Sequence, residues 1–183
     1  MNDLNIKKVG YVFGSFDPIH IGHISIAMQA LNDNIVDKVM FVPAKQNPWK
    51  KGTTDFNIRC EMLRASLSNL DDVGFTDIEN RVESQFTFDV LEAIEKDLKG
   101  RLKNNEKICI LTTQETYDEI PNWYKGKEIL EKYELHIVNM PIKIHSTDVR
   151  NMIKEGKTPY PYITKETYNV IKEKGLYGIK SDE

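Results

Sequence analysis

The chain has 183 residues, 40% of them hydrophobic and 29% charged, and its 25 basic and 28 acidic side chains give a net charge of −3. Domains commonly contain about 100–200 residues, so these values predict one globular domain over residues 1–183. The near-balance of charge argues against broad nucleic-acid binding, which needs a concentrated basic face, and the lack of an apolar run of about 20 residues argues against a membrane span.

The first half of the chain alternates apolar runs with segments of helical spacing. Apolar, β-branched runs ended by glycine or proline predict strands, and apolar residues recurring every three or four positions predict helices. Asp55 is expected to cap a helix, and the polar, lysine-bearing stretch before it is a candidate substrate loop. The predicted strands are Val9–Phe13, Lys38–Val42 and Val73–Ile78, and the predicted helices are Ile21–Leu31 and Phe56–Leu70.

The second half continues the alternation. Its predicted helices are Thr87–Leu98, Trp123–Tyr133, Thr147–Lys154 and Lys165–Lys174, and its predicted strands are Lys107–Leu111, Leu135–Val138 and Ile142–Ile144. Strands that alternate with helices predict an α/β fold, a doubly wound, Rossmann-like parallel sheet with helices on both faces. Ligands of such sheets bind at the carboxyl ends of the strands, near the point where strand order reverses.

The two cysteines and the first residues bear on the compartment. Cys60 and Cys109 lie in apolar settings without CxxC spacing, so a disulfide framework is not expected. Buried thiols fit a reducing compartment. No apolar run of signal-peptide length precedes the first predicted turn. A cytoplasmic location is therefore expected.

The strongest motif follows the first predicted strand. His20 and His23 are three residues apart at a helix start, so they share one side of it. Gly22 keeps space between the two rings, and the free N–H groups of the helix start suit an anion. Imidazoles donate hydrogen bonds to phosphate oxygens, more strongly when protonated. The expected ATP-binding residues of this segment are Gly14, Ser15, Phe16, His20, Gly22 and His23.

A second motif lies before a late helix. Ser146 or Thr147 is expected to cap the helix and turn its N–H groups toward an anion. Arg150, one turn later, reaches the same side. Taken alone, this spacing is a common helix start, and it gains meaning only beside the histidine motif.

Together the two motifs resemble the nucleotidyltransferase superfamily with the (T/H)xGH and ISSTxxR signatures. Ser146, Thr147 and Arg150 match the second signature, and His145 replaces its first serine. The resemblance implies that His20, His23 and Arg150 act on the triphosphate, and that the histidines stabilise negative charge as pyrophosphate leaves.

The chain also resembles, in order and over nearly its whole length, the bacterial nicotinate-mononucleotide adenylyltransferases. The matching segments are Pro43, Asn47-Pro48-Trp49-Lys50, Arg59-x-x-Met62, Ile78-Glu79, Phe86–Leu91, Ile120–Tyr124, Tyr162-Ile163 and Gly175–Tyr177. This implies adenylyl transfer from ATP to nicotinate mononucleotide, giving deamido-NAD and pyrophosphate. The chemistry needs positioning and charge neutralisation rather than a protein nucleophile. No clustered carboxylates suggest a metal cage, so Mg²⁺ is expected on the ATP phosphates and water.

The acceptor site is expected at three places. Trp123 offers a flat face on which a pyridine ring stacks. The helix start at Thr87 offers N–H donors to a nicotinate carboxylate. Lys50 or Lys45 is expected to meet the acceptor phosphate.

Three departures from the family pattern leave alternatives open. Phe13 replaces a glycine, Gln85-Phe86 replaces Ser-Tyr, and Thr113-Gln114-Glu115 replaces Gly-x-Asp near the adenosine, where Glu115 is expected to keep the acceptor role of the aspartate. The alternative acceptors are nicotinamide mononucleotide and phosphopantetheine. The alternative outside the enzymes is a non-catalytic nucleotide-binding regulatory module. The sequence leaves the oligomeric state open.

Overall fold

The computed structural model describes residues 8–45, 52–101, 107–139 and 142–179. The elements, in chain order, are β1 (Lys8–Gly14), α1 (Ile21–Asn32), β2 (Lys38–Pro43), α2 (Phe56–Leu67), β3 (Val73–Phe75), the short 3₁₀ helix η1 (Ile78–Asn80), α3 (Thr87–Arg101), β4 (Lys107–Thr112), α4 (Gln114–Glu119), η2 (Ile120–Asn122), α5 (Gly126–Lys132), β5 (Glu134–Ile137), α6 (Ser146–Lys154), α7 (Lys165–Glu173) and η3 (Leu176–Gly178). Across these ranges, no helix is long and apolar enough to cross a membrane.

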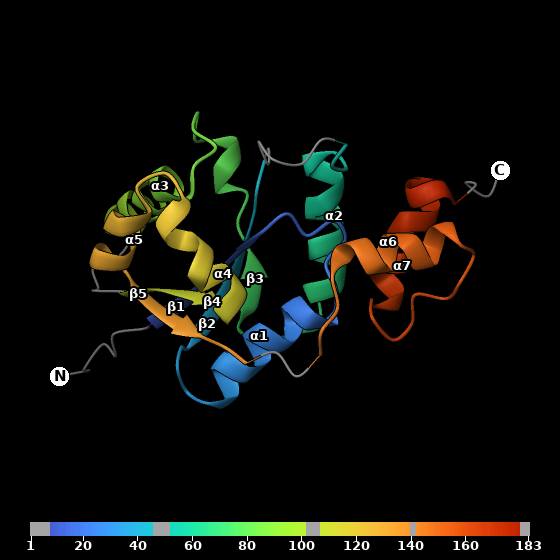
Figure 1. The fold of residues 1–183 in the computed structure, drawn as a ribbon, viewed down its shortest axis with the longest axis horizontal. Helices are drawn as coiled ribbons and strands as arrows, with labels where there is room; N and C mark the ends of the chain where they lie inside the picture. The colour runs from blue at the N-terminus through green and yellow to red at the C-terminus, as the bar shows by residue number, and fades with distance from the viewer. Residues whose placement is uncertain (1–7, 46–51, 102–106, 140–141, 180–183) are drawn as a thin grey trace.

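The five strands form one parallel sheet with the order β3-β2-β1-β4-β5. In this sheet β1 is central, and Tyr11 lies opposite Met40 of β2 and Ile110 of β4. The order reverses at β1 and β4, so the crevice that binds ligands in doubly wound sheets lies at the carboxyl ends of these two strands. The predicted α/β fold is confirmed, and Figure 1 shows the sheet between its helices.

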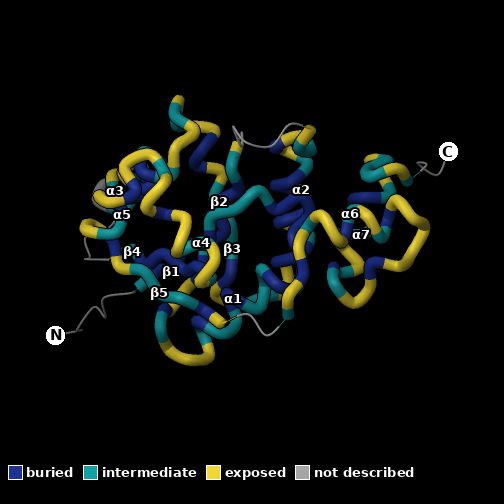
Figure 2. The backbone as a smooth tube through the Cα atoms, in the orientation of Figure 1, coloured by how far each residue is buried: buried dark blue, intermediate teal, exposed yellow. Residues whose placement is uncertain are grey.

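Helices cover both faces of the sheet because successive strand residues point to opposite sides. Val12 of β1 packs in a cluster with residues of α1, α2, α6 and α7. Its neighbour Tyr11 packs on the other face with Val90 of α3, and Ile110 packs with α3 and α5. Figure 2 shows the central strands β1, β2 and β4 among the most buried parts of the chain. Cys60 and Cys109 are free buried thiols, as expected.

Several predicted boundaries are wrong. Ile142–Ile144 is not a strand, because the buried Ile144 packs under α1 beside Gly22 instead of pairing with the sheet. The strand predicted at Val73–Ile78 ends at Phe75, where η1 soon follows. Helix α4 was not predicted, because none of its residues is buried and it therefore lacks an apolar period. The predicted cap at Asp55 is confirmed: its carboxylate accepts from the N–H groups of two residues in the first turn of α2.

Candidate functional site

Residues 14–20, from the last residue of β1 to the start of α1, form a turn that we call the phosphate turn after the ligand expected there from the sequence. It contains Phe16 in a left-handed conformation, with φ of 50°. The ring of Phe16 is buried against His23, with ring centroids 4.9 Å apart. The rings of His20 and His23 stack at 3.6 Å, so the structure brings the two predicted histidines together at the start of α1.

His20 is enclosed by the elements around it. Its side chain is 3% exposed, and its Nδ1 has no hydrogen-bond partner within the described chain. Burial, and then the charge of nearby His145, lower the pKa of His20 to about 4. The imidazole is therefore neutral at neutral pH. The protonated form, which is expected from the sequence to be the stronger hydrogen-bond donor, requires a bound anion that raises the pKa of His20 again.

Gly22 is required by the packing of these rings. A Cβ at this position would lie 3.0 Å from His20 Nδ1 and 3.1 Å from Ile144 Cγ2. Contacts this short force the neighbours to move, so the glycine leaves room beside His20. It does not separate the two histidine rings as the sequence predicts, because those rings stack directly on each other.

The start of α6 is docked on the phosphate turn. The Ser146 hydroxyl donates to the Pro18 carbonyl at 2.9 Å, and Arg150 Nη1 donates to the Asp17 carbonyl at 2.7 Å. Arg150 Nη2 donates to Thr147 Oγ1 at 3.1 Å. Both predicted motifs therefore meet at one place, although 133 residues separate Asp17 from Arg150.

The predicted cap of α6 is wrong by one residue. The N-cap is His145, which has an extended backbone and donates its N–H to the Asp148 carboxylate at 2.9 Å. Ser146 is the first helical residue, and its hydroxyl is already committed to the turn. Sequence reasoning missed His145, which lies close enough to His20 to lower its pKa.

Three other side chains that hold the turn were not assigned a role from the sequence. The Asp17 carboxylate accepts from the Tyr177 hydroxyl and from the Thr54 N–H, the latter at 3.1 Å. Arg59 Nη1 donates to the Ser15 carbonyl at 2.7 Å. These contacts link segments far apart in the chain, and the available sequence signal was the family pattern that contains Arg59 and Tyr177.

The end of β4 borders the same crevice. Thr113 caps α4, and its Oγ1 accepts from Thr116 N at 3.3 Å. Glu115 lies exposed in the first turn of α4. Because β4 pairs directly with β1, this turn and the phosphate turn leave the sheet side by side.

The predicted acceptor segments lie together on the α3 and α5 side of the sheet. Thr87 begins α3, and the half-buried Trp123 follows η2 and packs in the cluster of α3 and α5. The exposed rings of Phe86 and Tyr124, next to them in sequence, are 4.6 Å apart. Lys50 is outside the described residues, and Lys45 is exposed.

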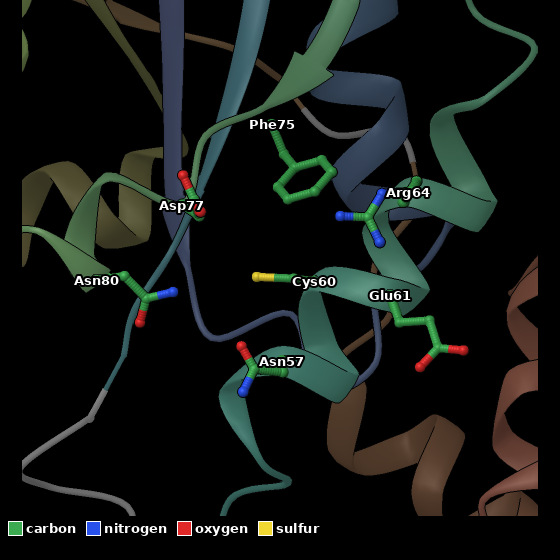
Figure 3. Close-up of a pocket in the computed structure, with 7 residues that line it drawn as sticks. All are labelled: Asn57, Cys60, Glu61, Arg64, Phe75, Asp77 and Asn80. Atoms are coloured by element: carbon green, nitrogen blue, oxygen red, sulfur yellow. The ribbon is translucent and has the colours of Figure 1, made fainter.

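A separate cavity of about 640 Å³ lies at the sheet edge between α2, β3 and η1. Figure 3 shows Cys60, Phe75 and Asp77 around it, and the Arg64 guanidinium carbon lies 5.5 Å from the centroid of the Phe75 ring. Burial raises the pKa of the Cys60 thiol, which keeps the thiol protonated and inert. None of the predicted site residues lines this cavity, so we assign it no part in the reaction.

We expect the free energy of unfolding to depend on pH through His20. Its pKa is 6.5 before folding and about 4 after it, so the unfolded chain binds the proton first and stability falls as pH drops through this interval. The full loss is roughly 3 kcal/mol. Urea unfolding of the wild type and of His20→Gln, above pH 6.5 and near pH 4, measures it. Glu79, whose burial raises its pKa to about 7, has the opposite dependence and cancels in the difference. A pH-independent difference between the two proteins would contradict the buried neutral imidazole.

Comparison with known proteins identifies relatives of the whole chain. The family described as cytidylyltransferase-like matches residues 11–174. A probable nicotinate-nucleotide adenylyltransferase of Carboxydothermus hydrogenoformans is 30% identical over 202 residues, which cover 93% of this chain and 98% of that protein. A protein of the same name from Clostridium tetani is 28% identical and is covered completely, with 94% of this chain.

Solved structures share the fold. A putative nicotinate-nucleotide adenylyltransferase from Vibrio parahaemolyticus superimposes with a TM-score of 0.75 at 25% identity, covering 90% of this chain and 99% of that one. The Plasmodium falciparum nicotinic acid mononucleotide adenylyltransferase complexed with NaAD has a TM-score of 0.76 at 20% identity, covering 96% of this chain and all of that one.

Proposed function

The chain belongs to the cytidylyltransferase-like family and, within it, to the nicotinate-nucleotide adenylyltransferases, and from this premise we propose that it joins ATP to nicotinate mononucleotide. It is an adenylyltransferase of NAD biosynthesis. The products are deamido-NAD and pyrophosphate. The observation that carries the proposal is the stacked pair of His20 and His23 at the end of the phosphate turn, together with Arg150 of α6, which donates a hydrogen bond to the same turn.

The proposed reaction is a direct displacement. An oxygen of the acceptor 5′-phosphate attacks the α-phosphorus of ATP in line, and the bond to the bridging oxygen of the β-phosphate breaks as pyrophosphate leaves. His20, His23 and Arg150 bind the β- and γ-phosphates and stabilise the charge that develops there. The N-termini of α1 and α6 add backbone dipoles to the same pocket.

The remaining ATP contacts follow from the two strand ends. The backbone of Gly14, Ser15 and Phe16 lines the triphosphate, while Ser146 and Thr147 hold the opposite side. Glu115, at the start of α4, accepts from the adenosine. This division fits a doubly wound sheet, in which the crevice between β1 and β4 takes the nucleotide.

We propose that Mg²⁺ enters the site bound to the nucleotide. Within the described residues, no cluster of three or more His, Cys, Asp or Glu side chains is placed to hold a metal ion. We propose that phosphate oxygens and water hold the ion, as is usual for Mg²⁺. When bound, the ion neutralises phosphate charge and orients the triphosphate.

The acceptor lies on the other side of the phosphate turn. In this proposal the nicotinate ring stacks on Trp123, its carboxylate meets N–H groups at the start of α3 near Thr87, and Lys50 or Lys45 meets its phosphate. The contact between Phe86 and Tyr124 supports the arrangement, because it brings the segments of Thr87 and Trp123 together. A cytoplasmic location fits an enzyme with two buried free thiols.

A pyrophosphate-release assay tests the function. The purified protein is given ATP with nicotinate mononucleotide, nicotinamide mononucleotide or phosphopantetheine, and each reaction is compared with ATP alone. We expect the highest kcat/KM with nicotinate mononucleotide, because a carboxylate makes stronger hydrogen bonds to N–H donors than an amide does. Preference for another acceptor would overturn the substrate assignment. ATP binding without pyrophosphate release would favour a non-catalytic nucleotide-binding module.

Trp123→Ala is expected to raise the acceptor KM about fivefold or more, since aromatic stacking contributes about 1 kcal/mol. The KM for ATP should change little, because the ring lies on the α3 and α5 side, away from the histidine pair. Steady-state kinetics with each substrate varied in turn measure both constants. An increase confined to the ATP KM would place Trp123 in the wrong half of the site.

A further inference from the structure

Among the residues that the structure describes, Arg59 of α2 is the largest fully buried side chain, with 1% of its surface exposed. Its three nitrogens donate to backbone carbonyls of three separate segments: Nη1 to Ser15 at 2.7 Å, Nε to Thr54 at 2.8 Å and Nη2 to Lys45 at 3.3 Å. Only a planar guanidinium reaches three carbonyls in fixed directions. Arg59 therefore ties the phosphate turn to Ala44 and Lys45, the residues that follow β2, which we call the Lys45 segment.

Glu79 holds the same segment from a different element. Its Oε2 accepts from the Lys45 N–H at 2.6 Å, and the residue is 5% exposed. The Lys45 backbone is thus fixed at its N–H by Glu79 and at its carbonyl by Arg59. The adjacent Ala44 N–H donates to the Gly14 carbonyl at 2.9 Å, which joins this segment to the phosphate turn directly.

Burial of the charged forms of Arg59 and Glu79 does not by itself stabilise the fold at neutral pH. Burial lowers the pKa of Arg59 and raises the pKa of Glu79 to about 7, since each loses hydration of its charged form. The charged groups that face Glu79 are Arg59 and Lys45. A carboxylate that accepts a backbone N–H is a stronger acceptor than a neutral carboxyl, so the hold on Lys45 is strongest when Glu79 is ionised.

We propose that Arg59 and Glu79 are positioning residues for adenylyl transfer, and that they fix the Lys45 segment against the phosphate turn so that the acceptor phosphate meets ATP in line. The inference rests on the proposed function, because it assigns this segment to the acceptor. Neither side chain touches a substrate in this proposal. Their effect is on geometry, and a misplacement of about 1 Å at a reacting centre costs about 100-fold in rate.

Glu79→Gln is the primary test, because it removes a buried charge without changing shape. Above pH 7 we expect the variant to have an unchanged or higher Tm, because a carboxyl whose pKa is raised by folding disfavours the folded state when it is ionised. Its kcat/KM for the acceptor should nevertheless fall about tenfold, because a neutral amide oxygen holds the Lys45 N–H less firmly. The KM for ATP should stay the same. Unchanged acceptor kinetics in the folded variant would overturn the proposal.

The pH profile separates positioning from a purely structural role. The ratio of wild-type to Glu79→Gln kcat/KM should be about tenfold above pH 7 and approach one below it, where Glu79 is protonated. Titration of ATP and of the acceptor is common to both proteins and cancels. A ratio that is constant across pH 7 would contradict the proposed role of the carboxylate.

Arg59→Lys tests the role of Arg59, since lysine keeps the positive charge but cannot donate to the three carbonyls in the fixed directions of a guanidinium. We expect a lower Tm together with a kcat at least tenfold lower. Leu63→Ala is the matched control, because Leu63 is fully buried on the same helix and packs in the core cluster that contains Val12. If Leu63→Ala with an equal loss of Tm reduces kcat as much, Arg59 acts only through stability. If the wild type releases no pyrophosphate with any acceptor, the proposed function fails instead.

Discussion

Replacing His23 by alanine is expected to lower kcat at least about 100-fold while the protein remains folded, the scale of losing one preorganised donor. The Nδ1 atom of His23 accepts from the His20 backbone N–H at 3.3 Å. In the neutral ring the proton is then on Nε2, the nitrogen that can donate to a phosphate oxygen. This contact strengthens as charge develops on the leaving pyrophosphate, so its loss reduces turnover more than binding.

Pyrophosphate release under saturating substrates measures the effect, and thermal unfolding of the same sample reports the fold. His136→Ala is the matched control, because His136 lies on β5, away from the histidine pair, and its removal should leave kcat unchanged. A folded His23→Ala protein with near-normal turnover would remove the histidine from the reaction.

Most of the element order could be predicted from the sequence, because the strands of a parallel sheet are continuous apolar runs. Lys38–Pro43, for example, is bounded by a charged residue and a proline. The strand order β3-β2-β1-β4-β5 was not predicted, because periodicity does not say which strands are neighbours. Short polar elements such as α4 were not predicted, because they bury no residue and therefore show no apolar periodicity.

The site was predictable where its residues are close in sequence. His20 and His23 share one helix start, so their spacing predicted that they lie on the same side of it, but not that their rings stack. The contacts that hold the phosphate turn were not predictable in this way. The hydroxyl of Tyr177 reaches Asp17 across 160 residues, and no local pattern encodes a contact of that span.

The turn that carries Trp123 is closed by a glycine with no room for a side chain. A Cβ on Gly126 would lie 1.8 Å from the Ile120 carbonyl oxygen, an atom of the backbone. The Gly126 N–H also donates to the Trp123 carbonyl at 3.0 Å. Because Lys125 already adopts a left-handed conformation, with φ of 52°, the turn cannot relax without moving η2 or α5.

Gly126→Ala is therefore expected to destabilise the protein by roughly 3 kcal/mol or more, since a clash with backbone is relieved only by shifting packed elements. Urea unfolding measures the loss, and Gly74→Ala is the control, because a Cβ there meets only the flexible Met40 side chain, at 3.3 Å. That variant should stay within about 1 kcal/mol of the wild type. A shift of η2 also displaces Trp123, so any folded Gly126→Ala protein should show a larger increase in the acceptor KM than in the ATP KM. Equal free energies of unfolding for the two alanine variants would mean that the turn accommodates a Cβ without loss of stability, and that it does not fix Trp123.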